Sequence, residues 1–170
     1  AYGSAGIGSQ AHFATELLAM QAGISLNHIS YKGTSQAFND LLAGNIALAM
    51  TTVAFVTPFI RSQRAIGLAV SAPRRLPQLP EVPTMAELGY KRFVIQTWFS
   101  LFAPAKTPQP VVDALDREIL RISRLPDIRE RLEKLGSESI STDAKAVTAR
   151  APEERRLWAE VIEKTGMKVE

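Results

Sequence analysis

The most constraining feature of the sequence is a glycine-rich turn between a short strand and a helix at the start of the chain. Residues 3–9 read Gly-Ser-Ala-Gly-Ile-Gly-Ser, and residues 10–22 carry apolar side chains at helical spacing before Gly23, a typical helix stop. Glycines let backbone N–H groups approach a ligand, and a helix N-terminus carries about half a positive charge. The turn is therefore either an anion-binding loop or an ordinary turn in which Ser9 caps the helix.

Strands and helices continue to alternate up to about residue 103. Turn and capping residues separate segments of strand-like pattern from segments with helical spacing. This order is typical of a parallel sheet flanked by helices, and it predicts the α/β fold class. The predicted strands are 1–2, 24–31, 46–50, 65–70 and 94–103, and the predicted helices are 10–22, 33–42, 58–63 and 84–88.

A proline-rich stretch then divides the chain. Pro104, Pro108 and Pro110 follow the last predicted strand. After them the pattern is helical, with amphipathic segments at 110–125 and 128–135 and a last helix at 152–165. We therefore expect two segments, a parallel α/β domain at residues 1–103 and a helical segment at residues 104–170.

Two further polar loops follow predicted strands and join the glycine-rich turn as candidates for a binding site. Residues 31–35 read Tyr-Lys-Gly-Thr-Ser and open a second helix, and Thr51 follows the next strand. The carboxyl ends of parallel strands share one edge of a sheet, where α/β proteins bind their ligands. Two helix N-termini on that edge can share an anion between them.

Composition argues against several classes of function. The chain has no cysteine, so disulfides, thiolate catalysis and cysteine-based zinc sites are excluded. The two histidines form no metal-ligand pair, and no nucleophile-elbow motif is present. The net charge of +3 is spread along the chain, and no apolar run reaches the roughly 20 residues of a membrane span. We expect no catalytic residue, metal, cofactor, nucleic-acid partner or membrane insertion.

One enzyme signature needs separate consideration. Gly6-x-Gly8-x-x-Ala11 matches the glycine pattern of dinucleotide-binding folds. That site also requires an acidic residue at the end of the next strand, where this sequence has Tyr31-Lys32. A nucleotide-dependent α/β enzyme that uses the turn at residues 3–9 therefore stays an alternative, as does a ligand-sensing effector domain of a regulator.

Taken together, these stretches resemble the receptors of tripartite tricarboxylate transporters, the Bug or TctC-type family. The segments that carry the resemblance, in order, are YGSAGIGSQAH (2–12), ISYKGTSQAFNDLLAGNI (29–46), LAVSAPRRLPQLPEVPTMAELGY (68–90), WFSLFAPAKTP (98–108), PVVDALDREI (110–119) and DIRERLEKLGSE (127–138). Each motif is weak alone, but their order and spacing match across nearly the whole chain.

The resemblance implies a type II, Venus-flytrap fold of the periplasmic-binding-protein kind. Residues 1–103 would be the second lobe, and the helices of residues 104–170 would return to a first lobe that is largely missing from this chain. The implied function is non-catalytic: an exported periplasmic receptor binds a small di- or tricarboxylate and delivers it to membrane permease subunits. Because the chain starts at the glycine-rich turn without an initiator Met, we expect a longer protein with a removed signal peptide.

The resemblance also assigns the binding residues of this lobe. They are Ser4, Gly6, Gly8, Ser9, His12, Tyr31, Gly33, Thr34, Ser35 and Thr51. Residues 46–51 depart from the family pattern, because they read Ile-Ala-Leu-Ala-Met-Thr where members commonly carry acidic residues. A missing carboxylate near the site removes a partner for a ligand ammonium, so we expect a preference for acids without an amino group.

Overall fold

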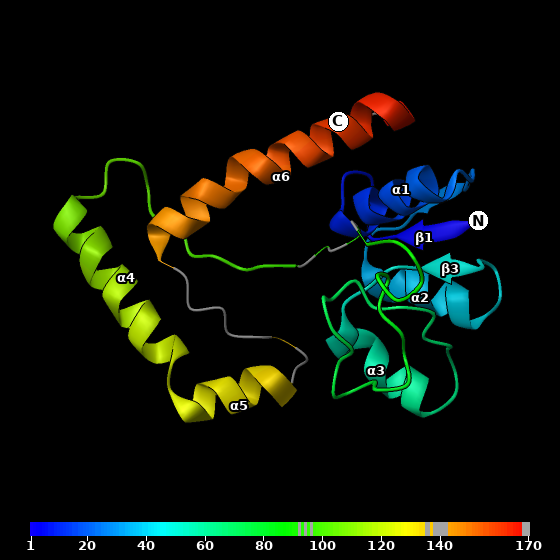
Figure 1. The fold of residues 1–170 in the computed structure, drawn as a ribbon, viewed down its shortest axis with the longest axis horizontal. Coiled ribbons are helices and arrows are strands. Elements are labelled where there is room, and N and C mark those ends of the chain that lie inside the picture. The colour runs from blue at the N-terminus through cyan, green and yellow to red at the C-terminus, as the bar shows by residue number, and fades with distance from the viewer. Residues whose placement is uncertain (92, 94, 96, 135–136, 138–142, 168–170) are drawn as a thin grey trace. The chain divides into compact units, whose positions relative to one another are not determined.

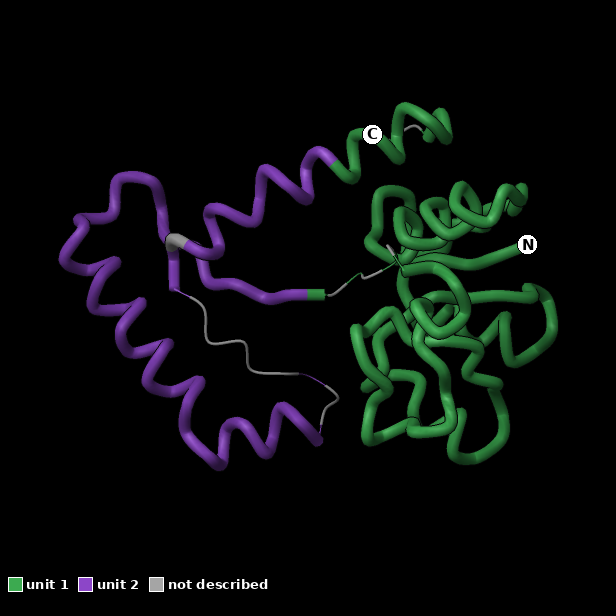
Figure 2. Tube along the Cα trace, in the orientation of Figure 1, with its two compact units in different colours: residues 1–97, 157–170 green, residues 98–156 purple. Residues whose placement is uncertain are grey.

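The computed structural model describes residues 1–91, 93, 95, 97–134, 137 and 143–167. The chain divides into two compact units, residues 1–97 with 157–170 and residues 98–156, which Figure 2 shows in two colours. Within the described ranges, every helix is too short or too polar to be a membrane span. The elements are β1 (Tyr2–Ser4), α1 (Gln10–Ala22), β2 (His28–Ser30), α2 (Thr34–Leu42), β3 (Leu48–Ala49), α3 (Val53–Arg61), α4 (Gln109–Ser123), α5 (Pro126–Lys134) and α6 (Ala144–Thr165).

The first unit is built on a short parallel sheet with strand order β2-β1-β3. β1 pairs with β2 from Tyr2 opposite His28 to Ser4 opposite Ser30, and with β3 through Gly3 opposite Ala49. Helices α1 and α2 both pack against β1 (Figure 1). All three strands therefore end at the same edge of the sheet, as the predicted alternation of strands and helices requires.

The local signals at its two ends set the bounds of α1. The Ser9 side chain accepts a hydrogen bond from the His12 N–H at the N-terminus. Gly23 ends the helix in a left-handed conformation (φ 65°), and its N–H reaches the carbonyls of Ala19 and Met20. The predicted bounds of this helix are therefore confirmed.

Two apolar clusters form the core of the first unit. The larger consists of buried side chains from α1, the loop after α3 and the last turns of α6, and the smaller lies within the segment 70–82. Val161 of α6 is fully buried, so the end of this helix is an integral part of the first unit. The larger cluster contains Ala14, Leu17, Met85, Phe93 and Val161, and the smaller contains Val70, Leu79 and Val82.

Several predicted elements are wrong in the segment after α3. Residues 65–70 form no strand and contribute only an isolated bridge between Val70 and Thr84. The nearby prolines have no N–H to donate, so the bridge cannot extend into a ladder. Residues 84–88 form a single turn that Gly89 ends (φ 96°). The described residues of 94–103 form no strand, and positions 94 and 96 of that prediction lie outside the described part.

The predicted helix at 58–63 starts five residues too late. The structure places its first residue at Val53, with Pro58 inside the helix. Proline removes one hydrogen bond from a helix interior but permits a helix when the surrounding contacts hold it. Here Phe55 and Phe59 of α3 pack against Phe38 of α2, with ring centroids 5.3 and 4.8 Å from Phe38. These contacts keep α3 continuous across Pro58.

The second unit is helical, as predicted for this part of the chain. α4 and α5 differ from the predicted ranges only at their ends, whereas α6 begins at Ala144 rather than at residue 152. Within this unit the Trp98 Nε1 donates to the Glu154 carboxylate at 2.8 Å, and Arg150 pairs with the same carboxylate at 2.6 Å. Glu154 thereby ties the start of the unit to α6.

Candidate functional site

The loops that follow β1 and β2 are neighbours at the carboxyl edge of the sheet. The Tyr31 N–H donates to the Ser4 carbonyl at 3.1 Å, and a Cβ added at Gly6 would lie 3.6 Å from the Tyr31 carbonyl oxygen. β3 runs parallel on the other side of β1, so Thr51 follows its end at the same edge. The structure thus gathers all three polar loops at one edge, as the sequence predicts.

A helix begins after each of these three strands. α1 begins at Gln10, α2 at Thr34 and α3 at Val53. The first N–H groups of a helix have no partner within it, and the helix dipole adds positive potential there. The sequence predicts two of these N-termini at the edge. The third was missed because Pro58 suggested a later start, although Thr52 before an apolar run is a capping signal.

Ser4 lies under the glycine-rich turn. Its side chain is buried, and its Oγ donates to the Gly6 carbonyl at 3.0 Å and accepts from the Gly6 N–H at 3.2 Å. The His28 Nε2 lies 2.7 Å from the same oxygen. Ser4 therefore uses its hydroxyl to shape the turn from inside, and His28 is a contributor to the site that the sequence did not identify.

The remaining residues of the turn are also held by local hydrogen bonds. The Gly8 N–H donates to His12 Nδ1 at 3.2 Å, and the Ser9 N–H donates to the Gly6 carbonyl at 3.2 Å. Gly6 and Gly8 have φ angles of 133° and 74°, which side chains rarely permit. The conformation of the turn therefore depends on glycine at both positions and on the His12 ring.

The Tyr31 hydroxyl is bound within the protein. It donates to Asp40 Oδ2 at 2.6 Å, and Asn45 Nδ2 lies 3.2 Å from the other carboxylate oxygen. The hydrogen bond from Tyr31 is the main cause that lowers the pKa of Asp40, and the hydrogen bond from Asn45 is a smaller one. The hydrogen bond to Asp40 in turn raises the pKa of Tyr31. The Asp40 charge is therefore already engaged by protein groups within α2 and its flanking loops.

The N-cap residues of α2 and α3 provide no side-chain hydrogen bond to the backbone of these helices. Gly33 is extended (φ 172°), has open space where a Cβ would stand, and provides no side-chain cap, and Thr52 likewise makes no side-chain cap hydrogen bond. Ser35 is exposed, while Thr34 and Thr51 are half-buried. The loops at this edge thus carry hydroxyl and N–H donors and no carboxylate.

A stacked histidine pair lies behind the turn. The rings of His12 and His28 are 3.8 Å apart at 14°, and the Tyr2 ring lies 4.9 Å from His28. Burial lowers the pKa of both histidines, while the Glu16 carboxylate opposes the shift. The Tyr2 hydroxyl donates to Glu16 Oε1 at 2.6 Å. Burial is the main cause that raises the pKa of Tyr2, and this hydrogen bond is the second.

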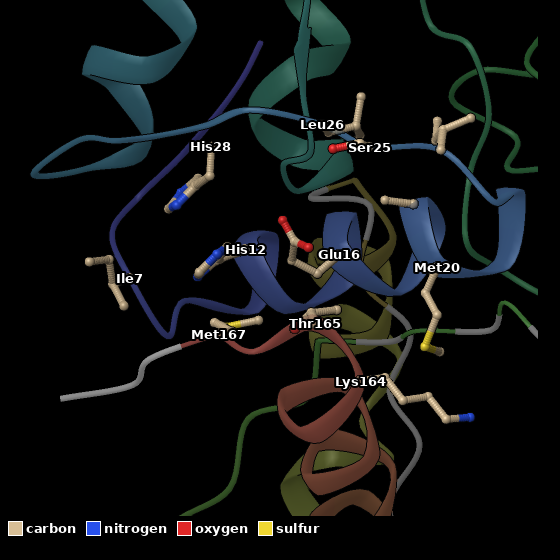
Figure 3. Close-up of a pocket in the computed structure, with 12 residues that line it drawn as sticks. Ile7, His12, Glu16, Met20, Ser25, Leu26, His28, Lys164, Thr165 and Met167 are labelled. Carbon is tan, nitrogen blue, oxygen red and sulfur yellow. The ribbon is translucent and has the colours of Figure 1, made fainter.

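The same histidines line a hollow of about 580 Å³ on the α1 and α6 side of the first unit (Figure 3). Glu16, Met20, Lys164 and Met167 line it as well. Among the described residues, no group of three or more His, Cys, Asp or Glu side chains could hold a metal ion. The hollow borders the glycine-rich turn, because Ile7 of that turn and His12 both line it.

Solved structures share this fold. The periplasmic binding protein BugD is 36% identical, with a TM-score of 0.84 over 98% of this chain and 56% of that one. A Rhodopseudomonas palustris protein solved with adipate is 26% identical (TM-score 0.87, 98% and 56% covered), and MatC of that organism, with bound malate, is 29% identical (TM-score 0.81, 95% and 56% covered). The fold class is therefore that of part of a periplasmic binding protein, which confirms the prediction.

The chain belongs to the tripartite tricarboxylate transporter receptor family, and the model of this family matches residues 1–167. A relative from Pseudomonas sp. strain P51, the UPF0065 protein in the tcbD-tcbE intergenic region, is 36% identical over 95% of this chain. BugT of Bordetella pertussis is 34% identical over 96% of it. The chain spans about half the length of these curated relatives, 48% and 50% respectively.

Proposed function

We propose that this chain is part of a non-catalytic, extracytoplasmic receptor that captures a small dicarboxylate or tricarboxylate. The observation that carries the proposal is the convergence of three helix N-termini at one edge of a parallel sheet. The loops contain no acidic side chain at residues 4–9, 31–35 and 50–52, so no carboxylate in them competes with an anionic ligand for the donors. The ligand class follows from this donor-rich, carboxylate-free edge.

Carboxylate oxygens suit the donors available there. Backbone N–H groups at helix N-termini and hydroxyls such as that of Ser35 bind an anion without transferring a proton or forming a bond. The extended backbone at Gly33 leaves room for close approach to the start of α2. Ligands in the two R. palustris structures, malate and adipate, are dicarboxylates without an amino group, and this supports the same class here.

The lobe assignment is part of the same proposal. Residues 1–103 form the second lobe, against which the end of α6 packs, and the preceding part of residues 104–170 reaches a first lobe, which supplies the other half of the binding cleft. The length of the Pseudomonas sp. strain P51 relative and of BugT, about twice that of this chain, supports this arrangement. The receptor acts in the periplasm after export and delivers its ligand to the permease subunits of a tripartite tricarboxylate transporter, as its family membership suggests.

Calorimetric titration of the full-length protein tests the ligand class. We expect malate, succinate or citrate to bind and aspartate to bind at least tenfold more weakly, because an ammonium meets no acidic partner in these loops.

The variant Ser35→Ala removes an edge hydroxyl and is expected to weaken binding about fivefold. The control Ser62→Ala changes a hydroxyl at the opposite end of α3 and is expected to leave affinity unchanged. Tight binding of aspartate with no binding of the plain acids would contradict the proposal.

The isolated chain of residues 1–170 is expected to self-associate. The apolar face of α4 is exposed, with Leu115 at 51%, and the preceding segment exposes Phe99 at 89% and Phe102 at 80%. Uncovered apolar surface of this kind favours association, and the proposed first lobe would cover it. Light scattering should give a mass above 18.6 kDa for the isolated chain and a monomer mass for the full-length protein. A monomeric isolated chain with cooperative melting would contradict the lobe assignment.

A further inference from the structure

The His12 side chain is part of the support of the glycine-rich turn. Its ring is buried, at 5% exposure, and its Nδ1 accepts the Gly8 N–H at 3.2 Å. Its backbone N–H donates to Ser9 Oγ at 3.3 Å. Side chain and backbone of one residue thus hold two consecutive positions of the loop that leads into α1.

His28 supports the other half of the same turn. Its Nε2 lies 2.7 Å from Ser4 Oγ, and that oxygen is hydrogen-bonded to both the N–H and the carbonyl of Gly6. Because the two rings stack at 3.8 Å, they form one rigid support beneath Gly6 and Gly8. The turn is therefore held from below by a pair of titratable groups.

The protonation state of His12 decides whether its hydrogen bond exists. A neutral imidazole has one acceptor nitrogen, and here the acceptor is Nδ1, facing the Gly8 N–H. A protonated imidazole carries hydrogens on both nitrogens, so Nδ1 would point an N–H at another N–H. A second positive charge on the stacked His28 would add repulsion at close range.

We propose that His12 is a positioning residue of the carboxylate-binding turn, which it holds only in its neutral form, so that affinity for the ligand falls when the histidine pair is protonated. The inference rests on the proposed function for the identity of the ligand. It differs from that function in assigning His12 to the support of the turn rather than to contact with the ligand.

Titratable groups on the neighbouring elements lie next to the pair or line the same hollow. Glu16 lies one turn along α1, Tyr2 stacks from β1, and Lys164 of α6 lines the same hollow while pairing with Glu160. Burial keeps the pKa of each histidine below the ordinary value of about 6.5, and Glu16 only partly offsets this. Both histidines are therefore neutral above about pH 6.5. Their support of the turn is lost as the pH falls through the lowered pKa values of the folded protein.

Three forms of the full-length protein test the inference: wild type, His12→Asn and His12→Ala. Asparagine places its Oδ1 where Nδ1 stands, so it keeps the acceptor but does not titrate. At pH 7.5 we expect His12→Asn to bind malate within about twofold of wild type and His12→Ala about tenfold more weakly. Between pH 7.5 and a pH below the midpoint of the His12 titration followed by NMR, wild type should lose about tenfold more affinity than His12→Asn. Both proteins meet the same protonation of malate, so their ratio isolates the ring.

NMR of the same proteins keeps the two proposals separable. In wild type the Gly8 amide resonance is expected to shift with the titration of His12, and in His12→Asn it should stay constant while the pKa of His28 rises. A wild-type affinity that changes with pH as in His12→Asn would overturn the inference. If no acid binds at pH 7.5, the proposed function fails, and the Gly8 amide alone then decides the positioning role: an amide indifferent to His12 protonation overturns it.

Discussion

Replacing Leu17 by alanine is expected to destabilise the protein by about 3–4 kcal/mol. Leu17 of α1 is 2% exposed and lies in the larger core cluster, together with Val161 from the end of α6. Truncation loses buried apolar surface and leaves a cavity that the surrounding helices cannot fill. Urea unfolding of the full-length protein, followed by far-UV circular dichroism, measures the change in the free energy of unfolding.

The matched control for this variant is Leu88→Ala. Leu88 is 52% exposed in the turn before Gly89, so the same chemical change is expected to cost about 0.5 kcal/mol. Similar losses at the two positions would show that the α1 and α6 contact does not form the core described here.

Replacing Gly3 by valine is expected to cost about 3 kcal/mol, because the centre of the sheet has no space for a side chain. A Cβ at Gly3 would lie 2.6 Å from Ile46 Cδ1, 3.0 Å from Tyr31 Cε2 and 3.2 Å from the Ala37 Cβ. All three neighbours would have to move, and Tyr31 and Ala37 belong to the loop and helix at the candidate binding edge. The same unfolding measurement gives the loss of stability.

Gly33→Val provides the comparison for Gly3→Val. Gly33 has an extended backbone and open space around the position of a Cβ. The unfolding free energy of this variant is expected to stay within about 0.5 kcal/mol of wild type, whereas its affinity for a carboxylate should fall because valine blocks the approach to α2. A stable Gly3→Val protein would contradict the close packing of β1.

Elements whose signals are local could be predicted from the sequence. The capping residue Ser9 and the terminating Gly23 fix α1 by hydrogen bonds to residues within one turn, so no distant partner is needed. The strand predictions at 65–70 and over the described residues of 94–103 failed because a strand exists only where a partner pairs with it. Prolines around Val70 limit its pairing to a single bridge, which apolar pattern alone does not reveal.

The candidate site shows the same division. The polar loops at residues 3–9 and 31–35 and at Thr51 could be assigned to one edge of the sheet, because parallel strands order their own ends. The roles of individual side chains could not. Tyr31 turns its hydroxyl to Asp40, and Ser4 turns its hydroxyl under Gly6. These choices depend on partners that only the folded chain brings near.

By itself, the sequence determined the α/β class, the position of α1 and the order of the loops and helices at the candidate binding edge. Those features follow from glycine and capping residues acting on their nearest neighbours along the chain. Only the tertiary structure decided that His12 stacks on His28 and that Val161 completes the core around α1. Both contacts join residues far apart in the chain, and burial and ring stacking act through space rather than along the sequence.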